Sequence, residues 1–328
     1  MAAVAEARKA DFSEVPVIDI APLLARDAAG MRRIAAEMRA AAELIGFFYI
    51  ANHGVDPALL ARTLEASRQF FALPAAERLK LTVNQWHRGF VPAGQTVLVA
   101  GLKPDLKESF NFSIELAPDD PDIVAGRPLA GPNQWPDLPG WRATVQAYYD
   151  AIVGLGNHVL RGLALALELG ETHFTDLFQR HIARARLLHY PPQDGPLAGD
   201  QFGAARHADY GCITILWQDP LGGLEVQNRA GDWIAAPFVP GTFVVNLGDL
   251  MQRWTNDRFV SAKHRVINRS GRERYSIPVF YDPAFDTVIE CLPTCQGPGN
   301  PARYPATTCG DWITAKYDKN YAYRKGAA

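Results

Sequence analysis

Hydrophobic residues in the first 180 positions recur mainly at helical spacing. In residues 31–45 the apolar side chains lie three or four positions apart, and Gly46 ends the run. Further helices are expected at 57–71, 141–169 and 171–180. The apolar run 47–50 predicts a strand directly after the first helix. Residues 1–180 are therefore predicted to form a helical region with short strands.

Short runs rich in β-branched and aromatic residues follow residue 182, separated by turn residues. They lie at 184–190, 212–218, 224–227, 233–235, 242–247, 262–268 and 272–281. Strands of this length and spacing indicate an antiparallel sandwich or barrel. We therefore expect a mainly β fold with flanking helices, in which residues 181–290 form the β core. Residues 291–328 are expected to form a C-terminal extension with a helix at about 307–319.

The composition favours a small-molecule partner. Lysine and arginine (33) nearly balance aspartate and glutamate (35), so the formal net charge is −2 and no basic surface for nucleic acid or anionic lipid is expected. The four cysteines are irregularly spaced, the N-terminus lacks an apolar signal, and no apolar run reaches the roughly 18 residues of a membrane span. We expect a cytoplasmic monomer or small homo-oligomer that binds neither nucleic acid nor membrane.

His207 and Asp209 form a His-x-Asp pair in the β-rich part of the chain, and His264 follows downstream. Side chains two positions apart on a strand point to one face, so His207 and Asp209 can bind one ion together. His264 shares its expected strand face with Ala262 and Val266, which suits an inward third ligand. Two histidines and one carboxylate leave coordination positions open, as in non-haem Fe(II) oxygenases. A His-x-Asp pair alone is more often structural, so this interpretation depends on the residues that accompany it.

Arg274 and Ser276 share one face of the strand expected at 272–281. An arginine inside a sheet is costly unless an anion pairs with it. A planar guanidinium beside a serine hydroxyl suits a carboxylate. With the metal motif upstream, the anion implied is the distal carboxylate of 2-oxoglutarate, whose 2-oxo acid end would chelate the iron.

These motifs, in this order, resemble the isopenicillin N synthase-like family of Fe(II)/2-oxoglutarate-dependent oxygenases. The resemblance covers nearly the whole chain and is carried by Val15-Pro16-Val17-Ile18-Asp19, Gly46-Phe47-Phe48-Tyr49-Ile50, Asn52-His53-Gly54-Val55, Arg88-Gly89-Phe90, Tyr190-Pro191-Pro192, His207-Ala208-Asp209-Tyr210-Gly211, Gly222-Gly223-Leu224-Glu225-Val226, Asn246-Leu247-Gly248-Asp249, His264-Arg265-Val266 and Arg274-Tyr275-Ser276. It implies a double-stranded β-helix (jelly-roll) core with the N-terminal helices packed on one side. It also implies that Tyr190 contacts the 2-oxoglutarate carboxylate. Leu188 stands where many plant relatives carry asparagine, which argues against the plant hydroxylase subgroup.

Aromatic residues that would line an apolar substrate pocket are Phe110, Phe112, Tyr210 and Phe280. Aromatic residues are as often plain core, but Phe280 shares the strand face of Arg274 and Ser276. Arg186 shares the strand face of Tyr190. It would either meet an acidic substrate or balance a buried acid, and both readings stay open.

The expected protein is a 2-oxoglutarate-dependent dioxygenase that oxidises an unactivated C–H bond of a small molecule and releases succinate and CO2. Hydroxylation is the first expectation, and desaturation or cyclisation are further outcomes of the same chemistry. The alternative enzyme is an Fe(II) oxidase of the isopenicillin N synthase type, which does not use 2-oxoglutarate. The non-enzymatic alternative is a pseudoenzyme that binds a small molecule. A zinc hydrolase would leave Arg274 and Ser276 without a role.

Overall fold

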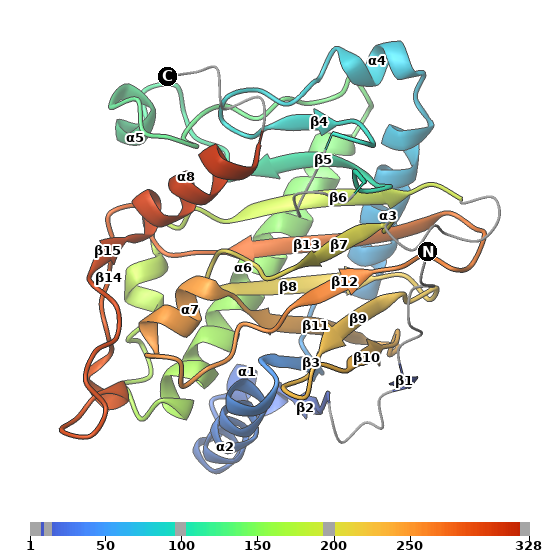
Figure 1. Ribbon diagram of the computed structural model, residues 1–328. Helices are drawn as coiled ribbons and strands as arrows, with labels where there is room; N and C mark the ends of the chain where they lie inside the picture. Colours follow the sequence, from blue (N-terminus) through green and yellow to red (C-terminus); the bar gives the residue numbers. More distant parts are fainter. Residues whose placement is uncertain (1–7, 10–14, 96–102, 193–200, 322–328) are drawn as a thin grey trace.

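Two facing β-sheets form the centre of the computed structural model, which describes residues 8–9, 15–95, 103–192 and 201–321 (Figure 1). The larger sheet has the strand order β2 (Val17–Asp19), β3 (Phe47–Ala51), β11 (Thr242–Leu247), β8 (Ile213–Gln218), β13 (Arg274–Tyr281), β6 (Arg184–Tyr190), β5 (Glu108–Ser113) and β4 (Gly89–Val91). The smaller sheet has the order β1 (Arg8–Lys9), β10 (Trp233–Ala236), β9 (Leu224–Gln227), β12 (His264–Val266) and β7 (Ala204–His207). Nearly all neighbouring strands are antiparallel; the pairs β2–β3 and β1–β10 are parallel.

Side chains alternate between the two faces of the larger sheet, and each face packs into its own apolar layer. On β3, Phe47 and Tyr49 join a buried cluster with Leu224 and Val226 of the smaller sheet. The intervening residues of β3 pack into the core on the opposite, helix-covered side. A strand buried on both faces reads as a continuous apolar run, as 47–50 does in the sequence. The two sheets thus close over one inner layer, which is the packing of a jelly roll.

Helices cover the outer face of the larger sheet. The long helix α6 (Trp141–Ala166) packs against both α2 (Ala28–Leu44) and α3 (Pro57–Ala72). Each of the three also contacts a strand: α2 lies on β3, α3 on β6 and α6 on β13. Aspartates cap the first two, because the Asp27 and Asp56 carboxylates accept hydrogen bonds from first-turn N–H groups. Shorter elements are α1 (Ala21–Ala25), α4 (Ala75–Leu79), α5 (Pro121–Val124), α7 (Asp249–Trp254), the strands β14 (Val288–Ile289) and β15 (Thr307–Thr308), and α8 (Cys309–Asn320).

The expected mainly β fold with flanking helices is confirmed, and all seven strands expected after residue 182 are present with small shifts at their ends. The helix expected at 171–180 is wrong: a single 3-10 turn, Thr175–Phe178, forms there. The segment must connect α6 to β6, and residues such as Thr172 and His173 favour helix only weakly. The larger sheet also includes β2, β3, β4 and β5 from residues 1–180, beside the strands of residues 181–290.

Gly46 connects α2 to β3 in a backbone conformation that favours glycine. Its φ is +70°, and a Cβ there would lie 1.9 Å from the carbonyl oxygen of Val260. Gly46→Ala is therefore expected to lower the free energy of unfolding by more than about 1 kcal/mol. Gly154→Ala is the control, because a Cβ at this position within α6 meets nothing within 4 Å and should stabilise by roughly 0.5–1 kcal/mol. Denaturant unfolding measures both, and equal stabilities would contradict the role given to Gly46.

Candidate active site

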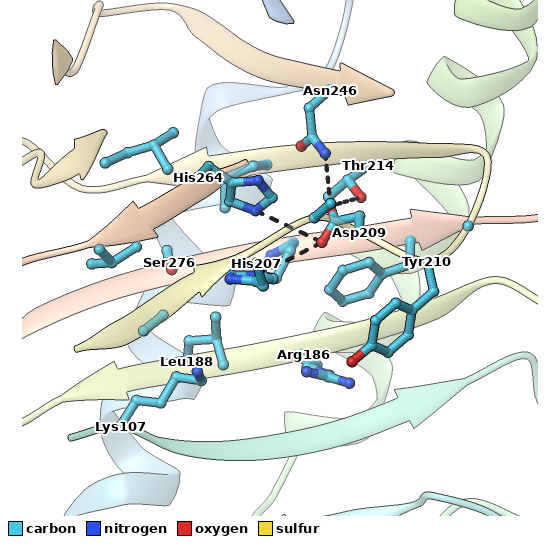
Figure 2. Close-up of a pocket in the computed structure, with 18 of the residues that line it drawn as sticks. Lys107, Arg186, Leu188, His207, Asp209, Tyr210, Thr214, Asn246, His264 and Ser276 are labelled. Atoms are coloured by element: carbon cyan, nitrogen blue, oxygen red, sulfur yellow. Dashed lines mark hydrogen bonds and ion pairs between the residues drawn. The ribbon is translucent and has the colours of Figure 1, made fainter. Parts of the chain in front are cut away.

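A cavity lies between the two sheets, and polar residues converge in its walls (Figure 2). The smaller sheet contributes His207 from the end of β7 and His264 from the start of β12. The larger sheet contributes Arg186, Leu188 and Ser276 from β6 and β13. The shape of the cavity therefore depends on how the sheets pack.

His207, Asp209 and His264 form a cluster of three metal-ligand side chains. The two histidines are directly opposite each other on β7 and β12, with ring centroids 4.3 Å apart. Oδ1 of Asp209 lies 3.8 Å from Nε2 of His207 and 3.7 Å from Nε2 of His264. Two donors that each lie about 2.1 Å from a shared ion are at most ~4.2 Å apart. The carboxylate is thus close enough to share one ion with either histidine, and the three ligand atoms all lie within 4.8 Å of one another.

The sequence predicted that His207 and Asp209 lie together because they share one face of a strand, and this explanation is wrong. β7 ends at His207, so Asp209 does not share a strand face with it. Backbone contacts fix the following segment instead: the Asp209 carbonyl accepts a hydrogen bond from the N–H of Asp249 at 2.8 Å. Gly248 approaches so closely that a Cβ there would lie 2.9 Å from the same carbonyl oxygen. The turn after the strand directs the carboxylate.

Backbone carbonyls orient both imidazole rings. Nδ1 of His207 lies 2.7 Å from the carbonyl oxygen of Ala205, and Nδ1 of His264 lies 3.3 Å from that of Ala262. A carbonyl can only accept, so Nδ1 carries the proton in each ring and Nε2 offers its lone pair on the side of Asp209. Burial lowers the pKa of His207 to about 3, and the adjacent His264 adds to this effect. The His207 ring is therefore neutral near pH 7, the form that binds a metal.

Two donors from the larger sheet hold Asp209. Its Oδ2 accepts hydrogen bonds from Oγ1 of Thr214 at 2.5 Å and from Nδ2 of Asn246 at 2.7 Å, and these residues are paired in register on β8 and β11. Burial acts to raise the pKa of Asp209, but the two histidines and these hydrogen bonds outweigh burial and hold the pKa below its usual value. The carboxylate is thus ionised, with Oδ2 engaged and Oδ1 facing the histidines.

Arg274 lies opposite Tyr190 on the β13–β6 pair, with its guanidinium carbon 4.6 Å from the centroid of the Tyr190 ring. The residue is 1% exposed. It donates hydrogen bonds to the carbonyl of Gly222, to Oγ of Ser276 and to Oε1 of Gln218. Within the described ranges no aspartate or glutamate forms an ion pair with it. A buried guanidinium with only neutral acceptors leaves its charge for an anionic ligand.

Two further buried cations in the cavity wall are neutralised by acids of the chain. Arg184 forms an ion pair with Asp282, and Lys107 forms one with Asp105. Asp282 also accepts a hydrogen bond from the N–H of Cys212 at 2.6 Å. These two pairs add no net charge to the cavity.

Tyr210, Phe280 and Arg186 lie in the cavity wall, whereas the expectation for Phe110 and Phe112 is wrong. The two phenylalanines are in register with Leu187 and Ala185 of β6, on the helix-covered side of the sheet. Their rings lie 5.2 Å from Trp141 and 6.2 Å from Tyr149 of α6, respectively. Register decides this, because a shift of one residue moves a side chain to the other face.

Several residues of the site were missed from the sequence. Thr214 and Asn246 did leave a signal, since each is a polar residue directly flanked by apolar residues on its strand. Tyr317 of α8 and Tyr321 beyond it also line the cavity. Tyr321 accepts a hydrogen bond from Arg186 at 2.9 Å. No motif marks these tyrosines, because only the packing of the C-terminal helix brings them to the site.

Comparisons with known proteins agree with this geometry. Residues 15–138 match the family described as the N-terminal part of non-haem dioxygenases in morphine synthesis, and residues 177–283 match the 2OG-Fe(II) oxygenase superfamily. The 2-oxoglutarate-Fe(II) type oxidoreductase hxnY of Emericella nidulans is 39% identical over 327 residues, which cover 95% of this chain and 93% of the relative. Kihadalactone A synthase LFS of Citrus sinensis is 34% identical over 93% of each chain.

Similar solved structures also include 2OG-Fe(II) oxygenases. A full-length Neurospora crassa protein, crystallised in complex with alpha-KG, has a TM-score of 0.84 and 28% identity over 93% of this chain and 96% of its own. A putative 2OG-Fe(II) oxygenase family protein from Caulobacter crescentus has a TM-score of 0.83 and 31% identity over 93% and 98%. The chain therefore belongs to the 2OG-Fe(II) oxygenase superfamily. It is a 2-oxoglutarate-dependent dioxygenase that uses Fe(II) and oxidises a small molecule. In the described ranges, no helix combines the length and apolar character needed to cross a bilayer.

The Arg184–Asp282 pair in the cavity wall predicts a large effect on stability. Asp282 is fully buried, so Asp282→Asn leaves Arg184 as an uncompensated buried charge and should lower the free energy of unfolding by about 3–5 kcal/mol. Glu37→Gln breaks the exposed Arg33–Glu37 pair of α2 and should cost no more than ~0.5 kcal/mol. Both are read from denaturant midpoints. A loss of stability as small for Asp282→Asn as for Glu37→Gln would contradict the importance given to the buried pair.

Proposed function

We propose that Fe(II) is held by His207, Asp209 and His264, and that 2-oxoglutarate is held by Arg274, Ser276 and Tyr190. The reaction is oxidation of an unactivated C–H bond, hydroxylation in the first instance, with release of succinate and CO2. The observation that carries the proposal is that a cluster of two histidines and one carboxylate shares its cavity with a buried arginine that has only neutral described partners.

The chemistry of the three donors suits Fe(II). Two imidazoles that present Nε2 and one carboxylate that presents a single oxygen would supply three donors to the ion, which would leave room for 2-oxoglutarate and dioxygen to bind. When bound, the iron with these two co-substrates supplies the oxidant that attacks the C–H bond. Asn246 and Thr214 keep Oδ2 of Asp209 engaged, so the carboxylate is oriented before the metal arrives.

The surroundings of Arg274 suit the distal carboxylate of 2-oxoglutarate. Gly222 and Gln218 accept hydrogen bonds from the guanidinium and fix its plane, and the Tyr190 ring lies against it. Ser276 adds a hydroxyl beside the guanidinium. A fixed planar donor next to a hydroxyl binds a carboxylate better than a mobile point charge would. Apolar side chains of the cavity, among them Leu188 and Val266, exclude water from the carbon chain.

We further propose that the protein works in the cytoplasm as a monomer or small homo-oligomer, without nucleic acid. The four cysteines are free thiols, which suits a reducing compartment. The formal net charge of −2 gives no electrostatic reason for binding nucleic acid.

Removal of the carboxylate ligand tests the metal assignment. Asp209→Ala should lower the affinity for Fe(II) by more than about 100-fold, and Thr214→Val, which removes only one hydrogen bond to Oδ2, by about 10–100-fold. Iron content after anaerobic reconstitution measures both, with circular dichroism as the control for folding. A folded Asp209→Ala variant that retains a full equivalent of iron would exclude Asp209 as a ligand.

Removal of the buried guanidinium tests the 2-oxoglutarate assignment. Arg274→Met should raise the apparent KM for 2-oxoglutarate by roughly 10–100-fold, the effect of losing hydrogen bonds to a charged group, while iron content stays unchanged. Succinate release over a range of 2-oxoglutarate concentrations gives the KM. Dioxygen uptake by the wild-type protein should require 2-oxoglutarate, and uptake without it would favour an oxidase of the isopenicillin N synthase type.

A further inference from the structure

The two proposed histidine ligands are supported unequally by their strands. β12, which carries His264, is paired on both sides, with β9 and with β7. β7, which carries His207, lies at the edge of the smaller sheet and is paired only with β12 among the described strands. The register of this pairing also shifts between His264 and Val266. Strand pairing therefore constrains His207 less than His264.

The chain that leads into β5 of the larger sheet makes further contacts with β7 and the residues before it. Oδ1 of Asp105 accepts a hydrogen bond from the N–H of Ala205 at 2.9 Å. The N–H of Leu106 donates to the carbonyl of Phe202, also at 2.9 Å. Ala205 is buried, so its N–H would be unsatisfied without the carboxylate. A segment next to the larger sheet thus holds the edge strand of the smaller one.

Ala205 is also the residue that orients His207. Its carbonyl accepts the hydrogen bond from Nδ1 of His207 at 2.7 Å, which leaves Nε2 for the metal. The carboxylate of Asp105 therefore acts on the ligand through a single residue. It fixes the backbone of Ala205, and the carbonyl of Ala205 fixes the imidazole ring. Because a partner that orients a ligand affects metal binding, a shift of this backbone should weaken the metal site.

Lys107 holds the carboxylate of Asp105 in place. The two side chains form a buried ion pair through Oδ2, while Oδ1 is directed at Ala205. Figure 2 shows Lys107 beside Leu188 in the cavity wall. A buried carboxylate would be costly without a cation to compensate it. Each oxygen of Asp105 thus has a partner, and the direction of the carboxylate is set.

We propose that Asp105 is a positioning residue for the Fe(II) ligand His207, which it fixes through the backbone of Ala205. Lys107 serves this role by holding the carboxylate of Asp105. The inference rests on the proposed function, because it takes His207 as a ligand. It gives the buried ion pair a role in metal binding beyond the neutralisation of charge in the cavity wall.

The test compares two double variants that differ only in the acceptor at position 105. Both carry Lys107→Met, so neither leaves a buried charge unpaired. In Asp105→Asn/Lys107→Met the amide oxygen can still accept from the N–H of Ala205, whereas the similarly shaped side chain of Asp105→Leu/Lys107→Met cannot. Competition with a coloured chelator under argon measures the Fe(II) affinity of each apoprotein. The leucine double variant should bind Fe(II) roughly 10-fold more weakly than the asparagine double variant.

A purely structural role would change stability without changing Fe(II) affinity. Glu171→Gln is the control, because it weakens the ion pair of Glu171 with Arg161, and neither residue lines the cavity. It should lower the denaturant midpoint and leave the Fe(II) affinity unchanged. Circular dichroism confirms that each variant is folded before its affinity is compared.

If the leucine double variant does not fold, Asp105→Glu replaces it. The longer side chain keeps a charge for Lys107 but displaces the carboxylate from Ala205, so a loss of at least about threefold in Fe(II) affinity is expected. Equal Fe(II) affinities in the two folded double variants, or an unchanged affinity in a folded Asp105→Glu, would overturn the inference. Failure of the proposed function is recognised separately, because His207→Ala would then bind Fe(II) as tightly as the wild type.

Discussion

The buried carboxylate of Asp209 links the two sheets, because it interacts with residues of both. Thr214 and Asn246 of the larger sheet hold one oxygen, and the other faces His207 and His264 of the smaller sheet. An ionised carboxylate in this position would be costly without such partners. The sheets can therefore close only when these strands are in register. The metal cluster therefore depends both on strand pairing and on the packing of the two sheets.

The distribution of charge around this carboxylate gives the cavity its chemistry. Arg184 and Lys107 are neutralised by Asp282 and Asp105, so they stabilise the walls without attracting a ligand. Arg274 differs because its described partners are all neutral. In a cavity of low dielectric such a charge strongly favours an anion of matching shape. The same strand pair carries Arg186 further along β6, where its guanidinium donates a hydrogen bond to the hydroxyl of Tyr321.

Some residues of the site could be predicted from the sequence, and others could not. The metal cluster was expected from residue types and spacing, but the reason given for Asp209 was wrong, since a turn and not a strand directs its side chain. Phe110 and Phe112 were expected to line the pocket along with Phe280, but only Phe280 had the further support of sharing a strand face with Arg274 and Ser276. Their register with Leu187 and Ala185 puts them on the helix-covered side, and strand register between segments far apart in the chain is not encoded in either strand alone.

Features that depend on residues close together in the chain could be predicted from the sequence. Helical spacing predicted α2, α3 and α6, and the short β-rich runs predicted seven of the strands after residue 182, although not β7. The motifs around His207 and Arg274 predicted the class of chemistry. Folding was needed to establish which face each strand presents, how Thr214 and Asn246 reach Asp209, and how Tyr317 and Tyr321 come to line the cavity. These features depend on contacts between segments distant in the chain, because side-chain packing and strand register are settled only when the sheets close.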